Sequence, residues 1–143
     1  MSNLSHFMKK NKIIKENITF AATKSLCDEK GNPVLWEIKP LSTKEDEQIK
    51  EACTYDAPVK GKPNLYRPKL NTNEYLNKML ASSVVFPDLF NADLQDSYKV
   101  KTPEDLLKEL IDDPGEYNEF GLFVQKYNGF DVSFNEKADE AKN

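Results

Sequence analysis

Three prolines at five-residue intervals, Pro58, Pro63 and Pro68, place the strongest constraint on the fold. Proline has no backbone N–H and clashes with the preceding helical turn, so no α-helix runs through this segment. We expect residues 54–71 to form an extended loop, with at most a brief edge strand around residues 65–66. This basic, proline-rich loop separates an N-terminal part typical of β-strands from a C-terminal part typical of helices.

Two strands are predicted before this loop. Residues 17–23 (NITFAAT) and 34–41 (VLWEIKPL) are rich in β-branched and aromatic side chains. In the second segment apolar and polar residues alternate, which places Trp36 on the buried side. The intervening residues 28–33 (DEKGNP) have the composition of a turn. We predict an antiparallel hairpin that packs on helices or gains a third strand, because a lone hairpin is marginally stable in water.

Helix-start signals follow at five places, each with a side chain that can accept a hydrogen bond from the first helical turn. They are Ser42, Asn71, Asn91, Thr102 and Asp113. Ser42 has a glutamate three residues later, which completes a capping box. Proline follows Thr102 and Asp113 at the first helical position. Apolar residues recur at helical spacing after these starts, so each helix is expected to bury one face.

The helix ends complete the predicted architecture. Pro87 is expected to end the second helix, whose apolar stripe includes Val84, and Asn128-Gly129 is expected to end the fifth. Residues 131–143 read as a last, charged helix. The predicted class is α+β, with an N-terminal β-hairpin or small antiparallel sheet followed by about five or six short helices.

The length of 143 residues suits one domain. Within this predicted domain, residues 1–41 hold a tail and the hairpin. Residues 42–71 hold the first helix and the basic loop, and residues 72–143 form the helical part.

Reactive side chains are scarce. The sequence has one histidine, His6, and two cysteines, Cys27 and Cys53. We interpret both cysteines as buried thiols and not as a disulfide. These are too few soft ligands for structural zinc, and a nucleophile–base pair would have to use His6. Asp93 and Asp96 would share a helix face, so an acid-pair hydrolase is an alternative. We predict no catalytic, cofactor-binding or metal-binding residue and hence no enzyme.

Charge and hydropathy exclude two further classes of partner. The formal net charge is −4, which disfavours nucleic-acid binding, although residues 60–69 are basic and include Tyr66. The sequence has no apolar run near the ~20 residues that a membrane-spanning helix needs. It also shows no secretory signal, so a cytoplasmic location is expected.

The segment VVFPDLFNADLQDSY, residues 84–98, combines large apolar side chains with acids and amides and has no basic residue. Such side chains are numerous for short helices around a small core, so some are expected to stay exposed. An exposed apolar patch in a domain without reactive groups marks a protein partner. We predict that five of these side chains form a partner-binding surface. For each of them the alternative is packing in the core. The five are Val85, Phe86, Leu89, Phe90 and Tyr98.

An ordered series of motifs runs along the chain. It comprises GNPVLWEIKPL (31–41), ACT (52–54), ASSVVFPDLFNADLQDSYKV (81–100), PGEY (114–117), NGFD (128–131) and EAKN (140–143). From about Phe20 onward the series resembles the XkdN-like phage tail assembly chaperones of contractile-tailed phages and prophages of Gram-positive bacteria. The chain departs from the pattern at Lys99, where glycine is expected, and residues 63–70 look variable.

This resemblance implies a non-enzymatic protein of the bacterial host cytoplasm. It would bind the tape measure protein, a long helical chain prone to aggregation, and keep it soluble while the tail tube assembles. It would be absent from the mature virion. Self-association is left open. The first alternative is a minor structural tail component or adaptor, and the second is an enzyme that acts through Asp93 and Asp96.

Overall fold

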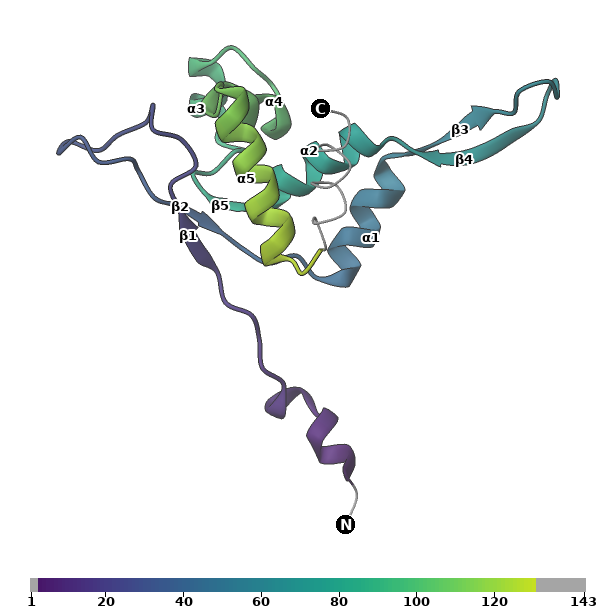
Figure 1. Cartoon of the computed structure of the whole chain (residues 1–143), viewed down its shortest axis with the longest axis horizontal. Helices are drawn as coiled ribbons and strands as arrows, with labels where there is room; N and C mark the ends of the chain where they lie inside the picture. The colour runs from purple at the N-terminus through teal and green to yellow at the C-terminus, as the bar shows by residue number, and fades with distance from the viewer. Residues whose placement is uncertain (1–2, 131–143) are drawn as a thin grey trace, which may run out of the picture.

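The computed structural model describes residues 3–130. The elements follow in the order η1 (Asn3–Phe7), η2 (Lys9–Asn11), β1 (Ile18–Phe20), β2 (Trp36–Ile38), α1 (Thr43–Ala52), β3 (Thr54–Pro58), β4 (Tyr66–Leu70), α2 (Thr72–Ser83), β5 (Val84–Phe86), α3 (Ala92–Ser97), α4 (Pro103–Leu110) and α5 (Pro114–Tyr127). Small antiparallel sheets and a mostly helical C-terminal part confirm the predicted α+β class (Figure 1). The last helix predicted from the sequence lies outside the described residues.

The predicted hairpin forms and gains a third strand. Ile18 faces Ile38 across β1 and β2, and Ile38 faces Val84 across β2 and β5; both pairs of strands are antiparallel. The expectation that Val84 continues the second helix is wrong, because α2 ends at Ser83 and β5 begins there. Val84 to Phe86 are β-branched or aromatic residues, and pairing with β2 satisfies their backbone before Pro87 is reached.

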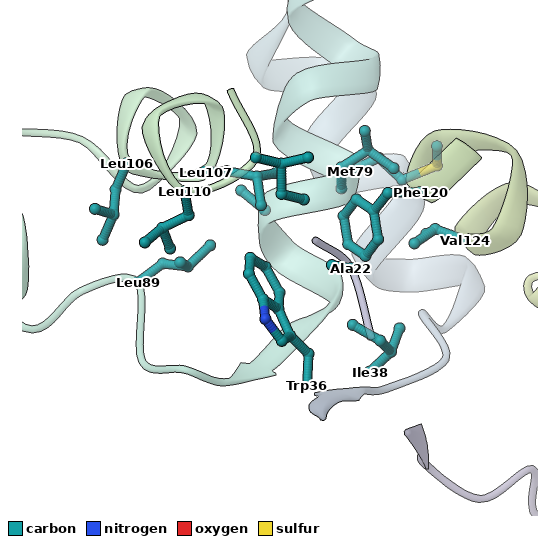
Figure 2. Packing of buried hydrophobic residues seen from close by; sticks show 13 residues of the cluster. Ala22, Trp36, Ile38, Met79, Leu89, Leu106, Leu107, Leu110, Phe120 and Val124 are labelled. Atoms are coloured by element: carbon teal, nitrogen blue, oxygen red, sulfur yellow. The ribbon is translucent and has the colours of Figure 1, made fainter. Parts of the chain in front are cut away.

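The core lies between this sheet and the helices. Figure 2 shows Trp36 and Ile38 projecting from β2 toward the apolar faces of the helices. The rings of Trp36 and Phe120 meet edge to face, with centroids 5.9 Å apart, and Phe20 stacks on Phe123 at 4.2 Å. The predicted burial of Trp36 is therefore confirmed, and its pairing with Phe120 fixes α5 against the sheet.

All five predicted helix caps are present. Asn71, Asn91, Thr102 and Asp113 each accept a hydrogen bond from the backbone N–H three residues later, at 2.9 to 3.1 Å. The capping box of α1 is reciprocal: the Ser42 hydroxyl accepts from Glu45 N, and Glu45 accepts from Ser42 N, both at 3.1 Å. These contacts satisfy N–H groups that a helix start otherwise leaves without partners.

The segment expected to be a loop is instead a β-hairpin. β3 and β4 pair antiparallel along their whole length, from Thr54 opposite Leu70 to Pro58 opposite Tyr66. The hairpin projects from the body of the molecule, at the upper right of Figure 1. Proline is tolerated where a strand edge faces solvent, and a two-stranded ribbon has two such edges. Gly61 and Asn64 adopt positive φ near the tip, as a tight reversal requires.

Two further features bear on earlier expectations. Cys53 is buried but Cys27 is exposed, and both are free thiols, so the expectation of a buried thiol is wrong for Cys27. Cys27 lies in an isolated bridge to Pro33, outside the named strands, and does not belong to the core cluster.

Across residues 3–130, no helix is long and apolar enough to cross a membrane.

Candidate interaction surface

The turn between β5 and α3 is held by local hydrogen bonds. The Phe86–Pro87 peptide bond is cis. Asp88 Oδ1 accepts from Phe90 N at 3.0 Å, and Gln95 Nε2 donates to the Leu89 carbonyl at 2.8 Å. These contacts fix the two neighbouring side chains in opposite directions, Leu89 toward the core and Phe90 toward solvent.

The structure separates the five residues predicted to bind a partner. Phe90 is 74% exposed, and Val85 and Phe86 on β5 are also exposed. Leu89 is only 1% exposed and packs in the core, so its place on a contact surface is wrong. Tyr98 is half-buried and packs against the core. Three of the five side chains, those of Val85, Phe86 and Phe90, are therefore exposed.

An apolar pocket of about 170 Å³ lies beside Phe86. Its walls come from the loop before β2, from β2, from the turn after β5 and from α3 and α4: they are Leu26, Val34, Trp36, Phe86, Pro87, Leu94, Tyr98 and Leu110. Sequence reasoning found Phe86 and Tyr98 but missed the others, because only the tertiary fold brings these segments together. We call the exposed side chains of Val85, Phe86 and Phe90, together with this pocket, the Phe86 surface.

Exposed acidic side chains lie on the same segment of chain as Phe86 and Phe90. Asp88, Asp93 and Asp96 are exposed, and residues 84–98 contain no lysine, arginine or histidine. Asp93 lies in the first turn of α3, where the helix dipole favours an acid. An apolar centre with a charged border is the usual anatomy of a protein-docking patch. Within residues 3–130, no group of three His, Cys, Asp or Glu side chains is placed to hold a metal ion.

Four groups elsewhere in the fold have shifted pKa values, and each shift has a structural cause. The hydrogen bond from Lys39, at 2.8 Å, and the helix cap lower the pKa of Glu45. Burial raises the pKa of Tyr117, whose hydroxyl donates to Asn77 Oδ1 at 2.7 Å. Burial, followed by a hydrogen bond to Asp46, raises the pKa of Tyr75. Burial also raises the pKa of the Cys53 thiol. None of these four groups belongs to the Phe86 surface.

Comparison with known proteins relates nearly the whole chain to one family. Residues 4–142 match the family model described as phage XkdN-like tail assembly chaperone protein. The chain belongs to this family of chaperones. The resemblance inferred from the motif series is thereby confirmed.

Two relatives from Bacillus subtilis (strain 168) match this tail assembly chaperone at 28% identity. The phage-like element PBSX protein XkdN matches over 141 residues, which is 99% of this chain and 94% of the relative. The uncharacterized protein YqbN matches over 142 residues, which is 99% of this chain and 93% of the relative. The crystal structure of YqbN superposes with a TM-score of 0.77 at 22% identity, covering 92% of this chain and 99% of YqbN. The two proteins therefore share a fold.

Lys99 marks the end of α3 in this chaperone, at the position where the motif pattern led us to expect glycine. Its φ is 59°, in the left-handed region that glycine enters most easily. Lys99 N donates to the Asp96 carbonyl and Val100 N to the Gln95 carbonyl, at 3.0 and 3.1 Å, which is the Schellman ending of a helix. Lys99 therefore adopts the backbone geometry that the expected glycine would adopt.

Proposed function

We propose that this chaperone binds the phage tape measure protein and keeps it soluble while the tail tube assembles. One observation supports this most directly: Phe86 is exposed beside an apolar pocket, and Val85 and Phe90 are exposed on the same segment of chain. A cluster of exposed apolar side chains marks a site for a protein partner more often than single exposed ones do. Membership of the tail assembly chaperone family supplies the class of process.

The shape of the surface suits a helical client. An amphipathic helix presents apolar side chains three and four residues apart, and a groove binder receives them as anchors. One client side chain would enter the pocket lined by Trp36 and Leu94, and the next would lie across Phe86 and Phe90. Such a small contact gives a modest affinity, because area is offset by the entropy of association. A modest affinity lets the client pass on to the growing tube.

Exposed acidic side chains contribute to the same task. Asp88, Asp93 and Asp96 are exposed on the same segment of chain as Phe86 and Phe90. A net charge away from zero opposes aggregation of a loaded complex. These acids also favour client segments with lysine or arginine beside their apolar anchors. This mechanism places the protein in the host cytoplasm during assembly and leaves it out of the finished particle.

Co-expression tests the proposal. The tape measure protein of the same phage should be insoluble alone and should appear in a soluble complex when this chain is present. Phe90→Ser removes an exposed side chain, so it should weaken client capture without changing the free energy of unfolding. Leu65→Ser is the matched control, because Leu65 is exposed on the distant β3–β4 hairpin. A tape measure protein that stays insoluble and is not pulled down would refute the function.

Two results separate finer alternatives. If Leu65→Ser and Phe90→Ser weaken capture equally, the client is held but the Phe86 surface is not its site. Mass spectrometry of purified particles distinguishes a chaperone from a minor structural tail component or adaptor. A chaperone should be missing from the particles, whereas a structural component should be present in every one.

A further inference from the structure

The N-terminal arm, residues 3–15, combines exposed apolar side chains with positive charge. Phe7 is 83% exposed and Ile13 is 94% exposed, and Ile14 is exposed beside it. Residues 3–15 contain four lysines and no aspartate or glutamate. Since the whole chain has a net charge of −4, the remaining residues have a net charge of −8. The arm is therefore basic and apolar on an otherwise acidic protein.

The arm leaves the body at the end of the sheet opposite the Phe86 surface. Ile18, where the arm joins β1, faces Ile38, and Phe20 at the other end of β1 faces Trp36, which lines the pocket. Lys15 Nζ donates to the carbonyl of Tyr127 and lies 4.9 Å from the centroid of its ring, so the root of the arm is held at the end of α5. From Lys15 toward the N-terminus the arm extends away from the body of the molecule (Figure 1). It therefore points away from its own Phe86 surface.

The arm and the Phe86 surface are complementary in chemistry. The surface is apolar, and the exposed acids Asp88, Asp93 and Asp96 lie on the same segment of chain, whereas the arm combines Phe7 and the isoleucines with lysines. The pocket has a volume of about 170 Å³. An apolar cavity of about 150 Å³ in another protein holds a benzene molecule, so this pocket is large enough for one phenyl ring. Phe7 supplies such a ring at the exposed part of the arm.

We propose that the arm of one copy of this protein binds the Phe86 surface of a second copy. Phe7 occupies the pocket, and the lysines that follow it face Asp88, Asp93 and Asp96. Exchange of two arms gives a closed dimer, in which each copy covers the other's exposed apolar side chains. If the proposed function holds, the arm and the client compete for one surface, and the client displaces the arm.

Self-association of the chain alone is the first test. Sedimentation velocity over a range of concentrations should show reversible association that weakens as salt is added, because opposite charges meet. Phe7→Ser should weaken association roughly ten- to a hundredfold, from the loss of one buried aromatic side chain. Since Phe7 is exposed, circular dichroism and the unfolding curve should not change. A chain that stays monomeric at every concentration overturns the proposal.

A charge-matched pair of variants tests the role of the lysines. Lys9→Glu, Lys10→Glu and Lys12→Glu together reverse the charge of the arm, and should abolish association. Reversal of three exposed lysines on the β3–β4 hairpin changes the net charge by the same amount and should leave association intact. They are Lys60, Lys62 and Lys69. Equal effects of the two triple variants contradict contact between the arm and the acids of residues 84–98.

Crosslinking identifies which chain provides the arm. In a Cys27→Ser background, Met8→Cys is made in one preparation and Ser97→Cys, on α3 beside the pocket, in another. After mixing, a short bis-maleimide should join the two variants into a heterodimer. A third chain carries both changes. If it crosslinks within itself while the mixture gives no heterodimer, the arm folds back onto its own chain. That result refutes a second copy as the partner.

The outcomes separate this inference from the proposed function. Self-association is measured without a client, so it can hold even if the tape measure protein never binds. If both hold, added client should lower the heterodimer crosslink yield in proportion to the chaperone it occupies. Client binding with an unchanged crosslink yield would show two independent sites and would overturn the competition.

Discussion

Thr23 and Glu116 join the segment that follows β1 to the first turn of α5: the Thr23 hydroxyl donates a hydrogen bond of 2.8 Å to Glu116 Oε1. The other carboxylate oxygen accepts from Lys24 N, also at 2.8 Å. Both carboxylate oxygens thus act as acceptors, and Thr23 is buried. This pair positions α5, and through it the core, against the sheet that supports the Phe86 surface.

Glu116→Gln should lower the free energy of unfolding by about 1–3 kcal/mol, because the amide presents N–H groups to one of the two donors. Urea denaturation followed by circular dichroism measures the change. Glu119→Gln is the control on the same helix, since Glu119 is exposed, and should shift stability by no more than about 0.5 kcal/mol. Equal effects of the two changes would show that the Thr23 contact does not stabilise the fold.

Lys99→Gly should raise the free energy of unfolding by about 0.5–1 kcal/mol. A left-handed backbone costs about 1–2 kcal/mol for a residue with a Cβ atom, and the greater freedom of glycine in the unfolded chain offsets part of this gain. Gly129 occupies the same position after α5, with a φ of 83°, and shows the favoured choice. Lys101→Gly, two residues on, should give no gain. Thermal unfolding of both variants checks the sign.

Gly121→Ala should also stabilise the protein, by about 0.5–1 kcal/mol, because glycine weakens a helix interior relative to alanine. Gly121 is buried in α5, and an added Cβ would lie 3.7 Å from Leu80 Cδ1, an ordinary van der Waals distance. Gly129→Ala is the contrasting change, since its positive φ penalises alanine, and it should destabilise. A loss of stability in Gly121→Ala would show that the contact with α2 is tighter than the distance indicates.

Glu45 should make stability depend on pH in the acidic range. Its pKa in the folded protein lies below the ordinary value of 4.5, chiefly because Lys39 donates to it. The stabilising contribution is therefore complete above about 4.5 and is lost as the pH falls through the lower, folded pKa. Glu45→Gln should be less stable than the wild type at neutral pH, and the difference should shrink toward pH 3. A difference that stays constant with pH would assign the effect to something other than the charge.

Rules that use only neighbouring residues predicted the helices well. They failed where pairing with a distant strand determines the secondary structure. The caps at Ser42, Asn71 and Thr102 depend on hydrogen bonds three residues apart, which a sequence displays directly. Val84 fits a helical stripe equally well, and only β2, more than forty residues earlier, selects the strand. Pro68 argued against a strand, yet an exposed ribbon tolerates it.

The candidate surface shows the same division. The aromatic residues of the segment 84–98 were visible in the sequence, and Phe86 and Phe90 are exposed. Leu89 is also a large apolar residue of this segment, but the hydrogen-bonded turn between β5 and α3 directs its side chain into the core. The pocket depends on Leu26 and Val34, which come from a loop some fifty residues away along the chain. No spacing within one segment could indicate that they line it.

The β3–β4 hairpin has a consequence for how this protein tolerates changes of sequence. Its residues are almost all exposed, and it joins the body at its base, where Asn71 N donates to the Cys53 carbonyl at 2.8 Å. Since its outer part contributes no residue to the buried core, a longer, shorter or differently charged ribbon is expected to leave the body folded. The ribbon is therefore the part of the described chain in which a change of sequence should cost the least stability.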